Sequence, residues 1–79
     1  MDDQIVAGAQ DAASELGYRL VESSVRQDVD PIYRFLFDAN GHDASVEFFA
    51  SESDVRRSGL SAREYAREEC LAGLRQPDA

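Results

Sequence analysis

The sequence predicts an α+β fold: a three-stranded antiparallel meander with two helices packed on one face, in the order α-β-β-β-α. Asn40-Gly41 stands between two runs of alternating apolar residues, which is the strongest short-range hairpin signal. Apolar residues at helical spacing mark both ends of the chain, and a strand pattern separates the first end from the hairpin. With 79 residues, we expect one small domain over 1–79.

The first helix is predicted over residues 2–16. Asp2 or Asp3 can cap its start, where a carboxylate also suits the positive end of the helix dipole. Gly17 ends it, because glycine adopts a left-handed cap without strain. The apolar stripe is mostly alanine, which allows a close approach to the sheet. The stripe comprises Ile5, Ala9, Ala12, Ala13 and Leu16.

The first strand is predicted over residues 18–29. The segment 22–24 in its middle is polar, which indicates an edge strand. Asp30-Pro31 ends the run, because proline lacks the N–H group that a strand ladder needs. One side of this strand is expected to carry Val21, Ser23, Val25, Gln27 and Val29.

The hairpin over residues 32–50 has a register that the turn dictates. If Asn40 and Gly41 are the two central residues of a type I′ turn, both need positive φ angles, and the pairing of the flanking strands follows. The expected pairs are Phe37 with Ala44, Phe35 with Val46 and Tyr33 with Phe48 on the core side, and Arg34 with Glu47 on the other.

The last helix follows a connector, residues 51–59, which has room for one helical turn. Ser61 and Glu64 form the S-x-x-E pattern of a capping box, so the helix is expected to begin there. It runs through Leu74 or Arg75.

Charge is the strongest compositional signal. The chain has 16 acidic and 8 basic residues, all of them arginine, for a net charge of -8. Such a charge should repel nucleic acid and anionic membranes and attract a basic protein. Alternatively, the acidity only confers solubility, and the lack of lysine reflects GC-rich coding or a salt-adapted source. The acids expected to form a continuous, partner-binding negative surface are Asp11, Glu15, Glu22, Asp28, Asp30, Asp38 and Asp43.

Apolar residues exceed the needs of one core in two places. On the outer side of the sheet, either the connector folds back over them or they meet a second copy or a partner. The last helix has an unusually broad apolar arc. Either it also touches the first helix, with arginine stems covering the rest, or it meets another chain. The candidate contact residues are Ile32, Leu36, Phe49, Arg63, Arg67 and Leu71.

Catalytic, metal-binding and phosphate-binding motifs are lacking. His42 lies in a turn rich in carboxylates, but a calcium loop needs glycine at its sixth and glutamate at its twelfth position. Cys70 has no nearby cysteine or histidine in sequence, and we expect a buried thiol. We therefore expect no enzymatic activity, no cofactor and no metal. One cysteine and the absence of a long apolar run favour a cytoplasmic location.

The element order resembles that of double-stranded RNA-binding domains. Those domains begin their last helix with a basic, lysine-rich segment that grips phosphates, whereas this chain has Ser61-Ala62-Arg63-Glu64, which disfavours RNA binding. We expect instead a non-enzymatic protein-binding module: a small acidic inhibitor or regulator of a basic nucleic-acid-handling protein. This expectation is a class analogy with phage and mobile-element inhibitors, the anti-CRISPR type included. A structural cytoplasmic homodimer without inhibitory function is the alternative.

Overall fold

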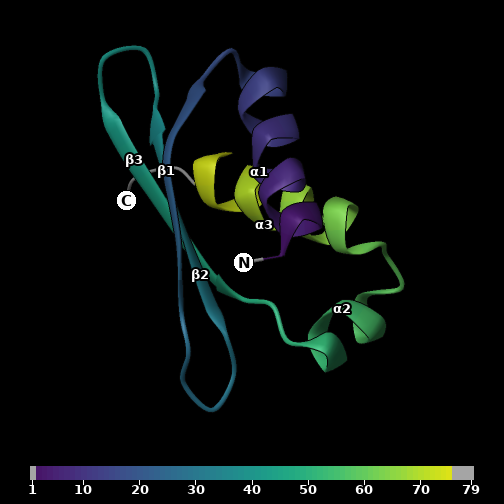
Figure 1. The fold of residues 1–79 in the computed structure, drawn as a ribbon. Coiled ribbons are helices and arrows are strands. Elements are labelled where there is room, and N and C mark those ends of the chain that lie inside the picture. The colour runs from purple at the N-terminus through teal and green to yellow at the C-terminus, as the bar shows by residue number, and fades with distance from the viewer. Residues whose placement is uncertain (1, 76–79) are drawn as a thin grey trace.

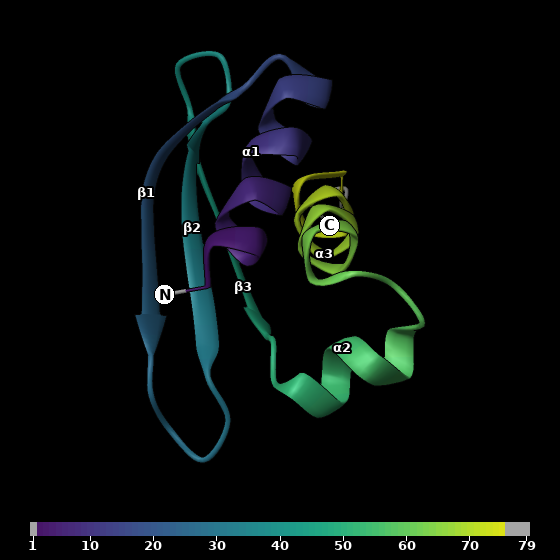
Figure 2. The same ribbon diagram turned by 45° about the vertical axis from the view of Figure 1, so that its right-hand side comes forward.

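The computed structural model describes residues 2–75 and shows one antiparallel sheet, in the order β1-β2-β3, with helices on one side (Figure 1). Both longer helices lie against the same face of the sheet (Figure 2). The predicted α+β class and element order are confirmed, and the connector contains an additional short helix. The elements are α1 (Asp3–Leu16), β1 (Arg19–Arg26), β2 (Ile32–Asp38), β3 (Asp43–Phe49), α2 (Glu52–Ser58) and α3 (Ala62–Arg75).

The β2–β3 hairpin has the predicted register at every pair. Asn40 and Gly41 have φ angles of 60° and 96°, both positive as a type I′ turn requires. The N–H of Ala39 donates to the carbonyl of His42 at 2.7 Å and closes the turn. Tyr33 pairs with Phe48, Phe35 with Val46, Phe37 with Ala44, and Arg34 with Glu47.

Strand β1 is shorter than predicted and contains a bulge. Its register against β2 shifts between Leu20 and Glu22, which leaves Val21 as an extra residue. Because the bulge changes the alternation, Leu20 and Val25 both pack against the core. The prediction that Val21 and Val29 share one side of the strand with Val25 is wrong: Val21 lies at the bulge and is 51% exposed, and Val29, beyond the end of the strand, is 97% exposed.

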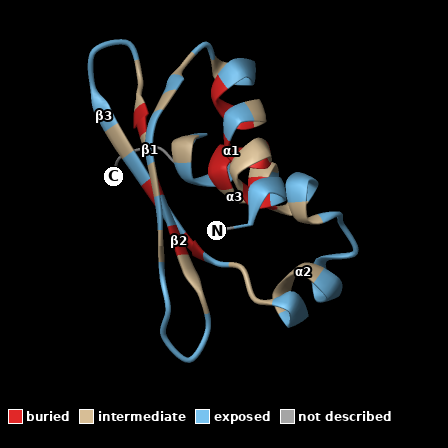
Figure 3. Ribbon diagram, in the orientation of Figure 1, coloured by how far each residue is buried: buried red, intermediate tan, exposed pale blue. Residues whose placement is uncertain are grey.

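The hydrophobic core lies between the sheet and the two longer helices, where the buried segments of Figure 3 face one another. Four core aromatic rings form a continuous array with centroids 5.8–6.5 Å apart. Such spacing is favourable beyond simple burial of area. The core comprises Ile5, Ala9, Ala12, Ala13, Tyr33, Phe35, Phe37, Val46, Phe48, Ala66, Cys70 and Leu71.

Helices α1 and α3 cross at very short range at Gly8. A Cβ atom at this position would overlap the carbonyl oxygen of Arg63 and lie 2.7 Å from the Cβ of Ala66. Gly8 therefore allows the contact of α1 with α3, which is the most extensive contact that α1 makes. The stripe was predicted to allow a close approach to the sheet, but the closest approach is to a helix.

Each helix begins next to a residue whose side chain caps its first backbone N–H groups. Asp2 caps α1, and its carboxylate accepts the N–H of Gln4 at 2.9 Å. Ser51 and Asp54 form a reciprocal capping box at α2, a seven-residue helix that buries none of its residues. At α3, the Ser61 hydroxyl accepts the N–H of Glu64 at 3.2 Å, which is one of the two hydrogen bonds expected there.

Cys70 is the buried thiol that the sequence predicts. Its side chain lies in the core between α3 and the sheet. Burial, with a smaller contribution from Glu69, raises the pKa of this thiol to about 12. A thiol with so high a pKa is almost entirely protonated at neutral pH and is a poor nucleophile.

Truncation of Phe35 tests the core. Phe35 is fully buried in the central strand. We expect Phe35→Ala to lower the free energy of unfolding by about 3–5 kcal/mol, because the lost ring leaves a cavity. Urea unfolding measures this loss. Val29→Ala is the control, because Val29 is 97% exposed, and it should change stability by about 0.5 kcal/mol or less. Similar losses in both variants would contradict the assigned core.

Alanine at Gly8 tests the helix crossing. The substitution raises helix propensity by about 1 kcal/mol, yet we expect a net destabilisation of about 1–3 kcal/mol, because the backbone of α3 blocks the added methyl group. Gln10→Ala, at an exposed position of the same helix, is the control and should be nearly neutral. A Gly8→Ala protein more stable than wild type in urea would refute the close crossing.

Candidate interaction surfaces

The helix-free face of the sheet is the first candidate surface. It consists of those residues of each strand whose side chains point away from the core. In Figures 1 and 2 the helices lie on the opposite side. Its residues are Arg19, Glu22, Ser24 and Arg26 of β1, Ile32, Arg34, Leu36 and Asp38 of β2, and Asp43, Ser45, Glu47 and Phe49 of β3.

Apolar side chains on this face have no covering element among the described residues. Phe49 is 55% exposed and lies directly opposite Ile32, while Leu36 lies farther along the central strand. The connector does not fold back over Phe49, as one of the two alternatives supposed, because α2 lies on the helical side (Figure 1). Tyr65 of α3 donates a hydrogen bond to the carbonyl of Phe49 at 2.7 Å and anchors the end of β3.

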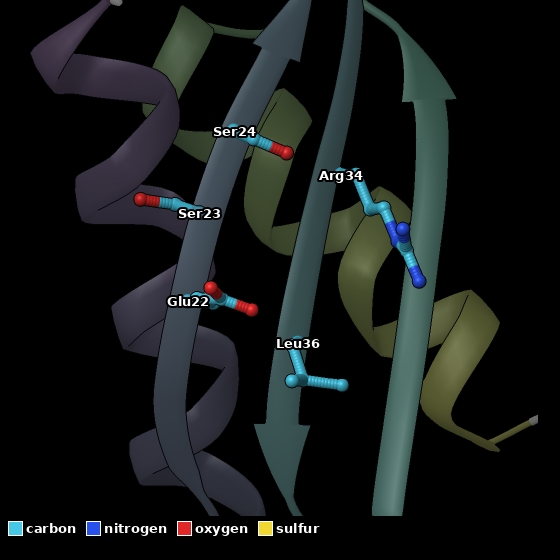
Figure 4. A pocket seen from close by; sticks show the side chains of 5 residues that line it. All are labelled: Glu22, Ser23, Ser24, Arg34 and Leu36. Atoms are coloured by element: carbon cyan, nitrogen blue, oxygen red, sulfur yellow. The ribbon is translucent and has the colours of Figure 1, made fainter.

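The charges on the helix-free face nearly balance, with three arginines against four acids. Arg34 lies 3.7 Å from Glu47, its cross-strand partner. Glu22 and Arg26 add one charge of each sign on β1. Two shallow depressions share Arg34, with volumes of about 260 and 180 Å³. Figure 4 shows the larger one, with Ser23 pointing toward α1.

Ion pairs link α1 to α3 beside their close crossing. The Arg63 guanidinium donates two hydrogen bonds to Asp11, at 2.6 and 2.9 Å. Arg67 and Arg75 both contact Glu15, at 2.5 and 3.3 Å. The Arg63 hydrogen bonds hold the pKa of the Asp11 carboxyl below its ordinary value of 3.8. These acids and arginines, which were expected to contact a partner, form ion pairs with each other within the chain.

The broad apolar arc of the last helix is explained by its contact with the first helix. Leu71 is only 3% exposed and belongs to the core, so its predicted role as a partner contact is wrong. The alternative interpretation is confirmed, since α3 packs against both α1 and the sheet. Arg63 and Arg67 cover the outer side of this helix pair.

The prediction that seven acids form one continuous negative surface is also wrong. Besides the two acids of α1, Asp38 is neutralised, by Arg19 at 3.3 Å. Asp38 and Asp43 lie at the end of the sheet that carries the β2–β3 turn. Asp28 and Asp30 lie at the other end, because successive turns of an antiparallel meander alternate between the two ends. Glu22 belongs to the helix-free face.

The acidic end is the second candidate surface. It consists of Asp2 and Asp3 at the start of α1, Asp28 and Asp30 between β1 and β2, and Glu52 of α2. Two hydrogen bonds bring these segments together: the Asp2 N–H donates to the Tyr33 hydroxyl, and the Ala50 N–H to the Pro31 carbonyl, each at 3.2 Å. Among residues 2–75, no arginine forms an ion pair with the four aspartates.

A depression of about 450 Å³ opens at the acidic end where α2 stands away from the other helices. Carboxylates of Asp2 and Glu52 lie beside apolar side chains. Arg56 is also present, 3.9 Å from Glu52 and highly exposed. The full lining is Asp2, Ile5, Ala50, Glu52, Val55, Arg56 and Ala62. Sequence reasoning missed this site, because local patterns do not specify where α2 lies relative to α1.

Within residues 2–75, no three histidine, cysteine, aspartate or glutamate side chains gather as metal ligands. No helix in the same part of the chain has the length and apolar character needed to cross a membrane. Comparison with family models, with curated proteins and with solved structures finds no match. Inference about function therefore rests on the two candidate surfaces.

Removal of Arg63 tests the helix-linking ion pair. A carboxyl titration followed by NMR should place the pKa of Asp11 below 3.8 in the wild type and higher in Arg63→Gln. Because the folded pKa is depressed, this pair stabilises the fold above pH 3.8, and its contribution is lost as the pH falls through the folded pKa. Arg57→Gln, which removes the same charge from α2, should leave Asp11 unchanged. Equal effects of both substitutions would contradict a direct contact.

Proposed function

We propose that this protein is a non-enzymatic protein-binding module whose acidic end binds a basic segment of a partner protein. The depression between α1 and α2 carries this proposal. It combines apolar side chains of Ile5 and Val55 with the acidic residues Asp2 and Glu52. Arg56 also lines it, but its contact with Glu52 is long, at 3.9 Å, and both side chains are highly exposed. This combination matches a lysine or arginine side chain, which has an apolar stem and a charged head.

The charge of the whole protein supports the same kind of partner. A net charge of -8 attracts a basic surface over a range of about one Debye length, roughly 8–10 Å at moderate salt. Asp3, Asp28 and Asp30 extend the negative field beyond the depression. Fixed charges of this kind chiefly raise the association rate and set specificity.

The partner class follows from the chemistry of the site. Grooves lined by arginine and lysine are the means by which proteins hold the phosphates of nucleic acids. A protein that occupies such a groove competes with the DNA or RNA, which is the action of an inhibitor or regulator. The analogy with phage and mobile-element inhibitors, the anti-CRISPR type included, rests on size and charge.

Neutralising the acidic end tests this proposal. The variant carries Asp2→Asn, Asp28→Asn and Asp30→Asn, and asparagine preserves the cap of α1. Proteins captured from lysate are identified, and their affinities are measured in a salt titration. We expect a captured nucleic-acid-binding protein to bind the variant about tenfold more weakly, since each exposed ion pair contributes roughly 0.2–1 kcal/mol. Its affinity for wild type should fall with salt.

The matched control removes the same number of charges elsewhere, by Asp43→Asn, Glu64→Gln and Glu69→Gln. None of these acids is ion-paired within the described residues. We expect the control to bind nearly as well as wild type. Equal weakening by both variants would show that binding depends on net charge and not on the acidic end. Capture of acidic or neutral proteins alone would refute the proposal.

A further inference from the structure

We infer that the helix-free face is a homodimerisation surface, on which the β2–β3 ladder packs against the same ladder of a second copy of this chain. This inference does not depend on the proposed function, because it uses a different surface. It rests on the register of the hairpin, the charge of the face and the exposure of its apolar residues.

The register makes the ladder complementary to itself. Consider a two-fold axis that is parallel to the strands and lies over the face, midway between β2 and β3. Rotation about this axis places each β2 residue over the copy of its own cross-strand partner. Ile32 then meets Phe49 of the second copy, and Phe49 meets Ile32, because these two residues are paired within one chain. The same operation places Arg34 over Glu47 of the second copy, in both directions.

The charge of the face favours a second copy over other partners. Arg19, Arg26 and Arg34 nearly balance Glu22, Asp38, Asp43 and Glu47, three positive against four negative charges, although the chain as a whole carries -8. A face that binds nucleic acid has a positive excess, and one that binds a basic groove has a negative excess. A nearly balanced face whose central Arg34 and Glu47 meet after a two-fold rotation fits its own copy. The rotation also places Asp38 over Asp43 at the turn end, where Arg19, 3.3 Å from Asp38, offsets part of the negative charge.

The apolar side chains supply the driving force. Phe49 is 55% exposed, and Ile32 and Leu36 of the central strand are only partly shielded by their neighbours. Stacking a second sheet about 10 Å away, at the usual angle of about −30°, removes such side chains from water. The ladder is small, comparable to specific interfaces of roughly 1,200 Å² or less in total. We therefore expect a weak dimer that dissociates on dilution.

Sedimentation equilibrium over a micromolar to millimolar concentration series tests the inference. Wild type should pass from monomer to dimer. Glu47→Arg should weaken dimerisation about tenfold or more, because it places arginines opposite each other. The double variant Arg34→Glu with Glu47→Arg should restore it, since the exchanged pair is again complementary within one chain and between copies. A monomer at every concentration, or a dimer indifferent to Glu47→Arg, would overturn the inference.

A second pair of variants separates the face from general surface hydrophobicity. Phe49→Asp should abolish the dimer, whereas Val29→Asp should not. Val29 is even more exposed, at 97%, but lies beyond the end of β1 and off the face. Circular dichroism and thermal melting show whether each variant is folded, and if Phe49→Asp unfolds, the charge-exchange series decides. Equal loss of dimerisation in both variants would refute the homodimer. So would binding of the wild type to an oligonucleotide, if Phe49→Asp abolished that binding.

Salt dependence distinguishes this dimer from the proposed basic partner. Two copies with a charge of -8 repel each other at long range, and salt screens that repulsion. Dimerisation should therefore strengthen between low and moderate salt, whereas binding of a basic protein should weaken. Dimerisation that weakens over this range would contradict an interface driven by apolar side chains. The role of the acidic end would then still be decided by the neutralisation experiment, because that experiment measures binding of a different protein.

Discussion

The close crossing of α1 and α3 at Gly8 is the contact on which the rest of the structure depends. Three strands spaced about 4.8 Å apart form a narrow platform, while packed helices usually lie about 8–10 Å apart. Two helices fit side by side over such a sheet only if they approach closely, and the missing side chain at Gly8 allows this. Both helices therefore cover one face, and no helix of residues 2–75 lies over the other.

The same crossing decides which charges are available to a partner. Asp11 and Glu15 of α1 meet Arg63 and Arg67 of α3 along the helix pair, so these charges cancel locally. Acids on segments without such arginine neighbours retain their field, and they gather where the start of α1 meets the β1–β2 connection. An overall acidic chain thus has ion-paired charges between its two longer helices, a nearly balanced sheet face and a distinctly acidic end.

Local patterns predicted the elements well and their mutual arrangement poorly. Asn40-Gly41 determined the hairpin register, because backbone geometry there allows one pairing. The bulge at Val21 escaped prediction, since an uninterrupted alternation was assumed through a polar strand. The pairing of Arg63 with Asp11 could not be predicted, because helical periodicity says which residues share a face and not which face meets which neighbour. Leu71 was misplaced for the same reason.

The two proposed surfaces are geometrically linked. A two-fold axis parallel to the strands preserves position along them, so both acidic ends of a dimer would lie at the same end of the assembly. Asp28 and Asp30 of each copy would then face one partner together, which increases avidity without any new contact. The same arrangement concentrates like charge and weakens the dimer at low salt. A basic partner that bridges both acidic ends would relieve this repulsion, so partner binding and dimerisation would strengthen each other by the reciprocity of linked equilibria.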